Sequence, residues 1–576
     1  MEPITDSELR ADAITATAIL NCLRREVTAL HGQVRTDETH VTFELPRTGI
    51  MLRARHGRWA WGPERLAGDV WQPLSWRELA SAVGQELTLH TGGSSDGLIA
   101  EITDSRAAIA AMLRARASAS TPRDFYQRSE QALIAGHRYH PAPKGRGGLE
   151  AEHWLPYAPE AHASFALPFL GVRADVVVDD GDTAALDTPG SDALGPGIPE
   201  GYRLLPAHPW QLALLRDRLH HLPALQDGRL RLLGTCERPV WPTSSVRTVC
   251  DPAADAFYKF SLDIQITNDI RRLWRYDLRW TVPLAHVLQP AFADVAAAFP
   301  GTAFLIDRGY RTIDVEDVDI YEGLAAIVRD GVRAHALPGI TPLLAAGISE
   351  GFLGNPLDGQ DANTALTWWQ RYLITVVSPA LYTYFHHGVV LECHLQNVLV
   401  GVDPDGMPAQ AFFRDHEGVR LLTDQHADLL HKIDGPRSFA RGVDTAYGWQ
   451  RLQYCLLTNH LHEIAGALIE RHPTLGAEIW AEARAVFLAY DRDYGAPREL
   501  RALLDSPQIP SKTNLLLRAT RAHGALSAYF PHPNPLRARC TSTVLAPLMR
   551  TAQDRRPTNC FTGPIPARSR RQSANT

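Results

Sequence analysis

HHGVVLECHLQNVLVGVDPDGMPAQAFFRD, residues 386–415, combines three short apolar runs with a turn-forming segment and four polar side chains. The runs at 389–391, 398–400 and 411–413 are rich in β-branched, aliphatic and aromatic residues, which is typical of short strands. The segment GVDPDGMP between the second and third runs supplies Pro and Gly turn chemistry. We therefore predict three adjacent strands built around one β-hairpin.

The polar residues of this stretch predict a magnesium-nucleotide site. Glu392 and His394 are two positions apart, so on a strand their side chains would share one face. Asn397 follows where the first run gives way to the second, and Asp415 ends the returning strand. Carboxylate and amide oxygens are donors that Mg²⁺ takes together with nucleotide phosphates. The alternative is that Glu392 and Asp415 are ordinary surface acids and His394 a hydrogen-bonded strand histidine.

Composition sets the outer limits. The chain has 576 residues, 45% apolar and 21% charged, which is ordinary for a globular protein of about two to four domains. A net charge of -6 argues against general binding to nucleic acid. No apolar run approaches the roughly 18 residues of a membrane helix, and the acidic start MEPITDSELRADA lacks a signal core. The seven cysteines form no CxxC pair, so we expect reduced thiols, no zinc or iron-sulfur site, and a cytoplasmic location.

The sequence pattern divides the chain into three folded regions and a tail. Residues 1–130 predict an α+β region, with helices at 9–30, 77–89 and 99–117 and a strand pair within 40–61. Residues 131–330 predict a β-rich region, with helices at 210–219 and 284–299 and a surface loop at 170–200. Residues 331–550 predict a mainly helical region; the helices expected there or at its edge are 323–336, 365–385, 447–469 and 477–490. Residues 551–576, rich in Arg, Pro, Ser and Thr, predict a disordered tail.

A second polar cluster lies at WPTSSVRTV, residues 241–249, and FYKFSLDIQITNDIRRL, residues 257–273. On a hairpin strand Ser245 and Arg247 would alternate with Ser244 and Thr248, and Lys259 would begin the next strand. Arg271 follows twelve residues later. Hydroxyl, ammonium and guanidinium groups hold phosphate and carboxylate oxygens. The alternative is a solvated sheet face with polar alternation.

Two histidine motifs precede this cluster. GHRYHPAPKGRGG, residues 136–148, predicts a basic loop suited to an anionic ligand. A metal site at His137 and His140 is the rival interpretation, but no third ligand stands nearby in the sequence. In PAHPWQ, residues 206–211, we expect His208 and Trp210 to serve packing and helix entry.

GHRYHPAPKGRGG, PAHPWQ, PTSSVRTV, KFSLDIQITNDIRRL, LECHLQNVLV and FFRDHEGV together, in this order, resemble the IucA/IucC family of siderophore synthetases that work independently of nonribosomal peptide synthetases. The resemblance spans about residues 125–525. It implies an α+β, multidomain cupped hand with antiparallel sheets: a thumb at 1–130, β-rich fingers at 131–330 and a helical palm at 331–550. It also implies that a carboxylic acid, usually citrate or a derivative, is adenylated with ATP and Mg²⁺ and then condensed with an amine or hydroxyl. A homodimer is implied by the resemblance alone.

The resemblance also assigns roles to residues of this chain. It implies that ATP is bound by Ser245, Arg247, Thr248, Lys259, His394, Gln396 and Asn397. The acid substrate would be held by His140, Lys144, Thr248 and Arg271, and catalysis would rest on Arg271, His394, His140 and Lys259. Magnesium would be bound by Glu392, Asn397 and Asp415. Lys512 and Arg518 resemble a further family segment, and no protein nucleophile is required.

Several points stay open at this level. Asn268 and Asp269 stand beside Arg271 where relatives carry a small residue, which leaves the identity of the acid open. ExHxxN at 392–397 also has the spacing of the DxHxxN loop of small-molecule kinases, so a phosphotransferase is the competing enzyme class. A citrate or iron-chelate binding protein without catalysis is the third hypothesis. The nucleophile, amide or ester product and number of condensation rounds are undetermined.

Overall fold

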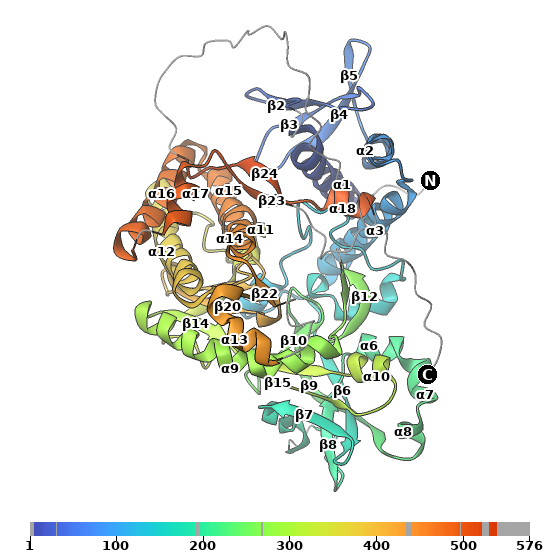
Figure 1. The fold of residues 1–576 in the computed structure, drawn as a ribbon. Coiled ribbons are helices and arrows are strands. Elements are labelled where there is room, and N and C mark those ends of the chain that lie inside the picture. Colours follow the sequence, from blue (N-terminus) through green and yellow to red (C-terminus); the bar gives the residue numbers. More distant parts are fainter. Residues whose placement is uncertain are drawn as a thin grey trace. The chain divides into compact units, whose positions relative to one another are not determined.

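The computed structural model describes residues 5–29, 32–191, 195–266, 269–433, 441–495, 497–520 and 529–537. This part of the chain mixes helices with several mainly antiparallel sheets (Figure 1), so the predicted α+β class is confirmed. The predicted disordered tail at 551–576 and the position of Asn268 lie outside the described residues.

The N-terminal part is an antiparallel meander packed on helices. Its five strands, in sheet order, are β1 Val34–Thr36, β2 His40–Glu44, β3 Met51–Arg55, β4 Trp61–Ala67 and β5 Val70–Pro73. The helices are α1 Asp6–Leu23, α2 Trp76–Thr91 and α3 Asp96–Ser118. The α2 helix begins with a capping box between Ser75 and Glu78 and ends at left-handed Gly92. The α1 helix continues as a π-helical turn, Arg24–Thr28.

An eight-stranded sheet forms the centre of the chain. In sheet order its strands are β7 Val177–Gly181, β15 Asp307–Ile313, β16 Ala326–Asp330, β11 Ala256–Phe260, β10 Thr248–Asp251, β9 Leu230–Pro242, β6 Phe165–Arg173 and β8 Tyr202–Pro206. A separate hairpin pairs β12 Leu262–Ile266 with β13 Asp269–Arg271. The short helices around these strands are α4 Phe125–Glu130, α5 Ala151–Trp154, α6 Pro209–Leu214, α7 Arg216–His220, α8 Pro223–Gln226 and α10 Val318–Gly323. Because β11 and β16 are central strands, nearly all of their residues are buried.

The remaining described chain packs long helices on a second, smaller sheet. This sheet has the order β14 Thr302–Leu305, β20 Pro408–Arg414, β19 Val398–Val402 and β17 Thr341–Leu344, with β14 parallel to β20. Three further strands, β18 Val389–Val390, β21 Arg420–Leu422 and β22 Gly442–Val443, form their own sheet, and β23 Gln508–Lys512 pairs with β24 Tyr529–Pro533. The helices are α9 Arg275–Ala298, α11 Ala345–Glu350, α12 Ala362–His387, α13 Thr423–Ile433, α14 Thr445–Gln453, α15 His462–Arg471, α16 Gly476–Asp493, α17 Arg498–Asp505 and α18 Leu515–Ala519. A second π-helical segment, Tyr454–Leu461, joins α14 to α15.

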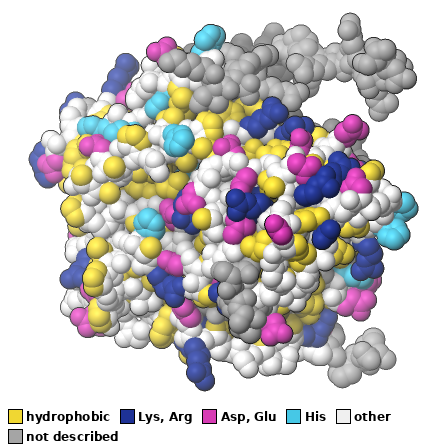
Figure 2. All heavy atoms as spheres, turned by 90° about the horizontal axis from the view of Figure 1, so that it is seen from below, with side chains coloured by type: hydrophobic (Ala, Val, Ile, Leu, Met, Phe, Trp, Pro, Cys, Tyr) yellow, Lys and Arg dark blue, Asp and Glu magenta, His cyan; other side chains and the backbone are white. Residues whose placement is uncertain are grey.

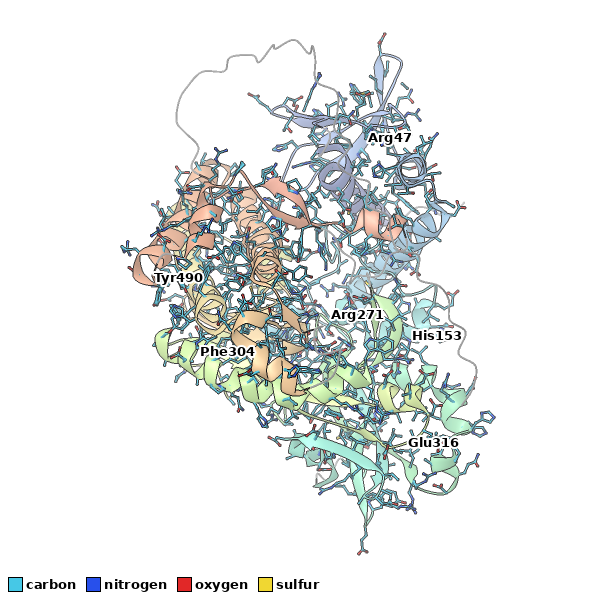
Figure 3. All side chains as sticks on the ribbon, in the orientation of Figure 1. Arg47, His153, Arg271, Phe304, Glu316 and Tyr490 are labelled. Atoms are coloured by element: carbon cyan, nitrogen blue, oxygen red, sulfur yellow. The ribbon has the colours of Figure 1, made fainter. Side chains whose placement is uncertain are left out.

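The largest hydrophobic core lies between α12, the smaller sheet and the helices that follow it. Trp368, Trp369 and Tyr372 on α12 are fully buried there. Phe304 of β14 stacks on Phe292 of α9 with ring centroids 3.7 Å apart. Figure 3 shows Phe304 and Tyr490 in this helical part and Arg271 nearer the centre of the view. The predicted helices at 365–385, 447–469 and 477–490 are confirmed by α12, by the run from α14 to α15, and by α16.

The structure corrects four expectations from the sequence. The run at 389–391 does not join the hairpin of β19 and β20, because β18 pairs with β21 instead. Residues 391–397 are irregular, so Glu392 and His394 do not share the face of a strand. Residues 243–247 form a tight turn rather than a strand. The helix expected at 323–336 is wrong because β16 occupies its centre. The loop expected at 170–200 contains an edge strand, β7.

Charged side chains of both signs lie interspersed on the face shown in Figure 2. This mixture matches a chain with 58 basic and 64 acidic residues. Within the described ranges, each helix is too short or too polar to cross a bilayer. The division into thumb, fingers and palm at 130 and 330 stays a prediction.

Candidate active site

A cavity of about 1550 Å³ collects most of the predicted site residues. The lining side chains come from β10, β11 and β13, from the segment 392–397, from the end of β20 and from the two π-helical segments. The predicted residues that line it are Lys144, Ser245, Arg247, Thr248, Lys259, Arg271, Glu392, His394, Gln396, Asn397 and Asp415. His140 does not line this cavity. It is buried, and its Nδ1 accepts a hydrogen bond from the backbone N–H of Ala142.

The turn 243–247 presents hydroxyl groups to the cavity. Val246 adopts a left-handed backbone (φ 66°), which is unfavourable for a β-branched residue. Thr243 holds the turn through hydrogen bonds from its backbone N–H and its side-chain hydroxyl to the carbonyl of Thr248, both 2.9 Å. The Ser245 and Thr248 hydroxyl oxygens then lie 3.3 Å apart. Thr248 is the direct partner of Lys259 across β10 and β11, so the hydroxyls and the ammonium meet at one place.

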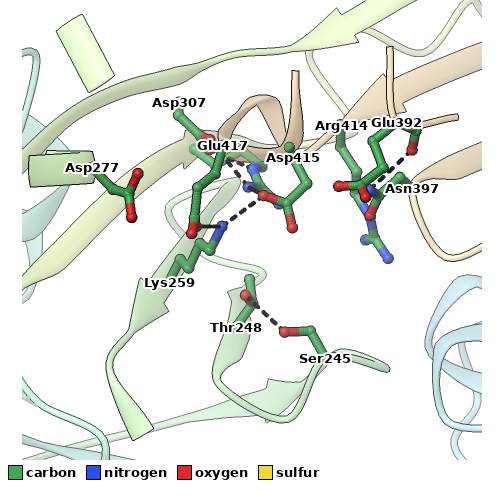
Figure 4. Close-up of polar contacts among 12 residues, drawn as sticks. Ser245, Thr248, Lys259, Asp277, Asp307, Glu392, Asn397, Arg414, Asp415 and Glu417 are labelled. Carbon is green, nitrogen blue, oxygen red and sulfur yellow. Dashed lines mark hydrogen bonds and ion pairs between the residues drawn. The ribbon is translucent and has the colours of Figure 1, made fainter. Parts of the chain in front are cut away.

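Lys259 is the centre of a buried charge cluster. Its Nζ lies 2.6 Å from a carboxylate oxygen of Asp415 and 2.5 Å from one of Glu417, and its side chain is only 1% exposed (Figure 4). Arg329 also contacts Asp415 at 3.1 Å, and Arg247 contacts Glu417 at 3.4 Å. Two carboxylates therefore face three cations in one low-dielectric cluster.

The cluster keeps both carboxyl groups ionised. Burial alone would raise the pKa of Asp415, but the charges of Lys259, Arg329 and Arg247 outweigh it and hold that pKa well below its usual range. The pKa of Glu417 falls to about 2 because Lys259 and Arg247 likewise overcome the effect of burial. Asp415 also has a left-handed backbone (φ 68°), a conformation that Asp tolerates better than most residues.

The segment 392–397 lies beside this cluster and is fixed from several sides. The carboxylate of Glu392 accepts a hydrogen bond from Arg451 at 2.8 Å. The amide nitrogen of Asn397 donates to the backbone carbonyl of Glu392 at 3.1 Å and lies 3.4 Å from Nε2 of His394. His460 holds the segment from the π-helix, with Nδ1 2.9 Å from the carbonyl of Cys393. Burial lowers the pKa of His394, so this imidazole is neutral at pH 7.

The oxygen donors of the site suit a magnesium ion only as part of a larger ligand set. Burial opposes ionisation of Glu392, but the charge of Arg451 overcomes it and lowers the pKa of that carboxyl. Glu392, Asp415 and Glu417 are thus anionic oxygen donors, and Figure 4 shows Asp415 between the other two. Among the described residues, no group of three or more His, Cys, Asp or Glu side chains could hold a metal ion by itself. A magnesium ion here would take further ligands from phosphate oxygens and water, as Mg²⁺ commonly does.

Arg271 and Lys512 add positive charge to the cavity wall. Arg271 on β13 donates a hydrogen bond to the carbonyl of Ile266 at 3.0 Å. Burial and the nearby Arg247 lower its pKa, although an arginine stays cationic. Burial also lowers the pKa of Lys512, while Glu392 opposes that shift. Asp269 lines the same wall.

Basic side chains of the loop 136–148 already form ion pairs within the protein, which the sequence did not indicate. Lys144 forms a buried ion pair with Glu160, and Arg146 lies 3.8 Å from the same carboxylate. Burial lowers the pKa of His137 to about 4. The role of Lys144 in substrate binding therefore stays a prediction, and it would require a ligand to compete with Glu160. His208, by contrast, caps α6 through its contact with the N–H of Trp210, as expected.

Sequence reasoning missed four residues that complete the charge cluster and its support. They are Asp307, Arg329, Glu417 and Arg451. Glu417 stands two positions after Asp415, so the pair of acids in RDHEG was a usable signal. Arg329 was hidden by the mistaken helix at 323–336, and Arg451 reaches the site from a helix 59 residues after Glu392.

Comparison with known proteins places this architecture. The model of the IucA / IucC family matches residues 125–349, and that of the ferric iron reductase FhuF-like transporter family matches residues 366–527. The L-2,3-diaminopropanoate--citrate ligase of Staphylococcus aureus is 29% identical over 72% of this chain and 75% of its own length. The rhizobactin siderophore biosynthesis protein RhbC of Rhizobium meliloti is 28% identical over 91% of this chain and 97% of its own length. The ATP-bound aerobactin synthetase IucA of Klebsiella pneumoniae has the same fold, with a TM-score of 0.79, 19% identity, and coverage of 92% of this chain and 100% of that one.

The fold and the cavity define an α+β protein with cationic and carboxylate groups gathered around one large binding site. Residues 125–349 match the IucA / IucC family model, and the chain is similar in sequence to named siderophore synthetases and citrate ligases, as its sequence motifs indicated.

Proposed function

We propose that this protein is an ATP-dependent siderophore synthetase. It adenylates a carboxylic acid, with citrate or a citrate derivative as the first candidate, and condenses the acyl-adenylate with an amine. The observation that carries this proposal is the contact of Lys259 with both Asp415 and Glu417. Through that contact, the groups on β10 and β11 that could bind phosphate lie beside the carboxylates that follow β20, and both sets line one cavity.

The residue types match the charge changes of adenylation. A carboxylate oxygen of the acid attacks the α-phosphorus of ATP, and the bond from that phosphorus to the bridging oxygen breaks to release pyrophosphate. Lys259 and Arg247 would stabilise the negative charge on the phosphate oxygens, with Ser245 and Thr248 donating hydrogen bonds. Arg271, on the adjacent hairpin, would hold a carboxylate of the acid through its guanidinium fork. Here positioning and electrostatics carry the reaction, so no covalent protein intermediate is needed.

The second step forms the product. The nitrogen of the amine attacks the acyl carbon, a C–N bond forms, and the bond to AMP breaks as the amine loses a proton. Neutral His394 lines this cavity and is our candidate to accept that proton. Magnesium bound by Asp415, Glu392, Asn397 and Glu417 would supply charge neutralisation at the phosphates.

The choice of citrate rests on the similar proteins. Three are named as citrate ligases, for diaminopropanoate, spermidine and D-ornithine, and two others as citryl-hydroxylysine synthases. Their amines differ, so the names favour the acid more than the nucleophile. The homodimer also stays a prediction, which light scattering of the full chain would test.

The direct test is product analysis with a panel of acids. The protein is incubated with ATP, Mg²⁺, one acid at a time and hydroxylamine as a general nucleophile, and AMP, ADP and pyrophosphate are measured in parallel. We expect AMP and pyrophosphate in equal amounts only when citrate or a related acid is present. ADP without AMP would instead support the kinase-like phosphotransferase, and binding of citrate without any nucleotide turnover would support a binding protein.

A further inference from the structure

The cavity is larger than one ligand requires. Its volume of about 1550 Å³ exceeds the roughly 300–1,000 Å³ of common small-molecule sites. The charge cluster around Lys259 forms one part of its lining. A different part of the lining comes from the two π-helical segments: Arg25 on Arg24–Thr28, and Tyr454, Thr458 and Asn459 on Tyr454–Leu461. π-Helical turns are uncommon and occur frequently at functional sites.

Arg25 is the unusual residue of this second part. It is only 9% exposed, and its guanidinium carbon lies 3.3 Å from the ring centroid of Tyr139, so the group is stacked on that ring. Within the described chain, no hydrogen bond or ion pair joins this guanidinium to another side chain or to the backbone. Burying a guanidinium costs free energy unless its N–H groups find acceptors. The stacking fixes the plane of the group and leaves its donors for a ligand in the cavity that Arg25 lines.

Two carboxylates that feel the charge of Arg25, those of Glu26 and Glu463, are bound by other groups. Glu26 accepts hydrogen bonds from the backbone N–H groups of Asn514, Leu515 and Leu516 at 2.9 to 3.0 Å. Glu463 is bound by Arg58, with Nη2 3.2 Å from its carboxylate and 2.6 Å from its backbone carbonyl. Neither acid therefore supplies an acceptor to Arg25. The charge and the donors of this guanidinium face a space that a carboxylate would fill.

We propose that Arg25 binds a carboxylate of the nucleophile, so that the preferred amine is of the amino-acid type rather than a simple polyamine. This inference rests on the proposed synthetase function. Arg25 lines the cavity from the π-helical segment Arg24–Thr28, whereas Lys259 and Arg271 line it from β11 and β13. In the proposed reaction Lys259 and Arg247 already serve the phosphates, and Arg271 serves a carboxylate of the acid. The carboxylate left for Arg25 is therefore that of the amine.

The experiment compares pairs of amines that differ by one carboxylate. We would measure kcat/KM for 2,3-diaminopropanoate against 1,2-diaminoethane, and for ornithine against 1,4-diaminobutane, with the wild-type chain and with Arg25→Gln and Arg25→Lys. Arg24→Gln is the matched control, because Arg24 neighbours Arg25 on the same turn but does not line the cavity. Hydroxamate formation with hydroxylamine, which has no carboxylate, normalises each preparation for active enzyme.

We expect the wild-type chain to prefer the carboxylate-bearing member of each pair. Arg25→Gln should raise its KM by about 10- to 100-fold, as expected for losing a charge-assisted hydrogen-bond pair, and so remove the preference. Arg25→Lys should keep part of it, and Arg24→Gln all of it. The wild-type comparison holds even if Arg25→Gln folds poorly.

Three results would overturn the assignment. They are a wild-type chain without preference for the carboxylate, a preference that survives in Arg25→Gln, and a rise in KM for the acid during hydroxamate formation by Arg25→Gln. The last result would give Arg25 to the acid substrate. Absence of hydroxamate in the wild-type chain with every acid would instead contradict the proposed synthetase function.

Discussion

The ammonium of Lys259 and the carboxylate of Asp415 lie 2.6 Å apart although 156 residues separate them in the chain. Lys259 comes from the central strand β11 of the eight-stranded sheet, whereas Asp415 follows β20 of the smaller sheet. The site therefore exists only where two different sheets meet. Loss of this contact should affect both chemistry and stability, which the following variants can separate.

Lys259→Met should lower the rate of acid-dependent pyrophosphate release by about 10²- to 10³-fold, because it removes a cation proposed to face the phosphates. The variant also leaves the buried negative charges of Asp415 and Glu417 with one cation fewer, so we expect the free energy of unfolding to fall by about 3 kcal/mol. Urea unfolding and steady-state kinetics measure the two effects.

Arg311→Met is the control for this loss of stability. Arg311 is 1% exposed, as Lys259 is, and pairs with Asp179 and Asp187 away from the cavity. This variant should be destabilised to a similar extent while its rate per folded molecule stays normal. Equal loss of activity in both variants would contradict a specific role for Lys259.

Gly418→Ala should disturb the carboxylate of Glu392 without disrupting the fold. A Cβ at Gly418 would lie 1.8 Å from Oε2 of Glu392, so that flexible side chain must rotate away and lose its place beside Arg451. We expect the Mg²⁺ concentration for half-maximal rate to rise several-fold. In Gly476→Ala the new Cβ would have no neighbour nearer than 4.0 Å, and this control should behave like the wild-type chain.

Glu26 predicts a specific dependence of stability on pH. Burial raises its pKa to about 7 from an ordinary value of 4.5. Between these values the folded chain binds a proton that the unfolded chain has released, so the free energy of unfolding should fall as pH rises. For this single group the decrease is on the order of 3 kcal/mol between pH 4.5 and 7.

The difference between wild type and Glu26→Gln isolates this contribution. We expect the stability of Glu26→Gln relative to wild type to increase from pH 4.5 to pH 7 in urea unfolding experiments, because the neutral amide does not titrate. A difference that is constant across this range would show that Glu26 ionises normally in the folded chain.

Arg271→Gln should weaken the binding of the acid substrate rather than the binding of ATP. Its guanidinium lies on the cavity wall near Arg247, and its removal should raise the KM for the acid by about 10- to 100-fold with little change in the KM for ATP. The initial rate of hydroxamate formation at varied acid and ATP gives both constants. A larger rise in the KM for ATP than in the KM for the acid would show that Arg271 binds the phosphates instead.

Local patterns predicted the long elements well. The helix expected at 365–385 is α12, because its apolar residues recur with helical period and bury against the smaller sheet. The helix expected at 323–336 failed because Ile327 and Val328 occupy a central strand, where pairing with β11 and β15 overrides the local preference. Nothing near this segment in sequence encodes those two partners.

The site was predictable by residue type and less so by geometry. Thr248 and Lys259 were expected on neighbouring strands and are direct partners. The turn at Val246 was missed because a β-branched residue with positive φ contradicts its own propensity and is imposed by hydrogen bonds around Thr243. Glu417 and Arg329 were missed because their importance depends on the contact between two sheets.

In the proposed reaction, a carboxylate of the substrate attacks the α-phosphorus of ATP in the cavity around Lys259. The most direct measurement uses citrate labelled with ¹⁸O in its carboxylates, ATP, Mg²⁺ and hydroxylamine, followed by mass spectrometry of the nucleotide products. We expect one ¹⁸O atom in the phosphate of AMP and none in pyrophosphate. Label in inorganic phosphate together with ADP, or AMP without label, would contradict it.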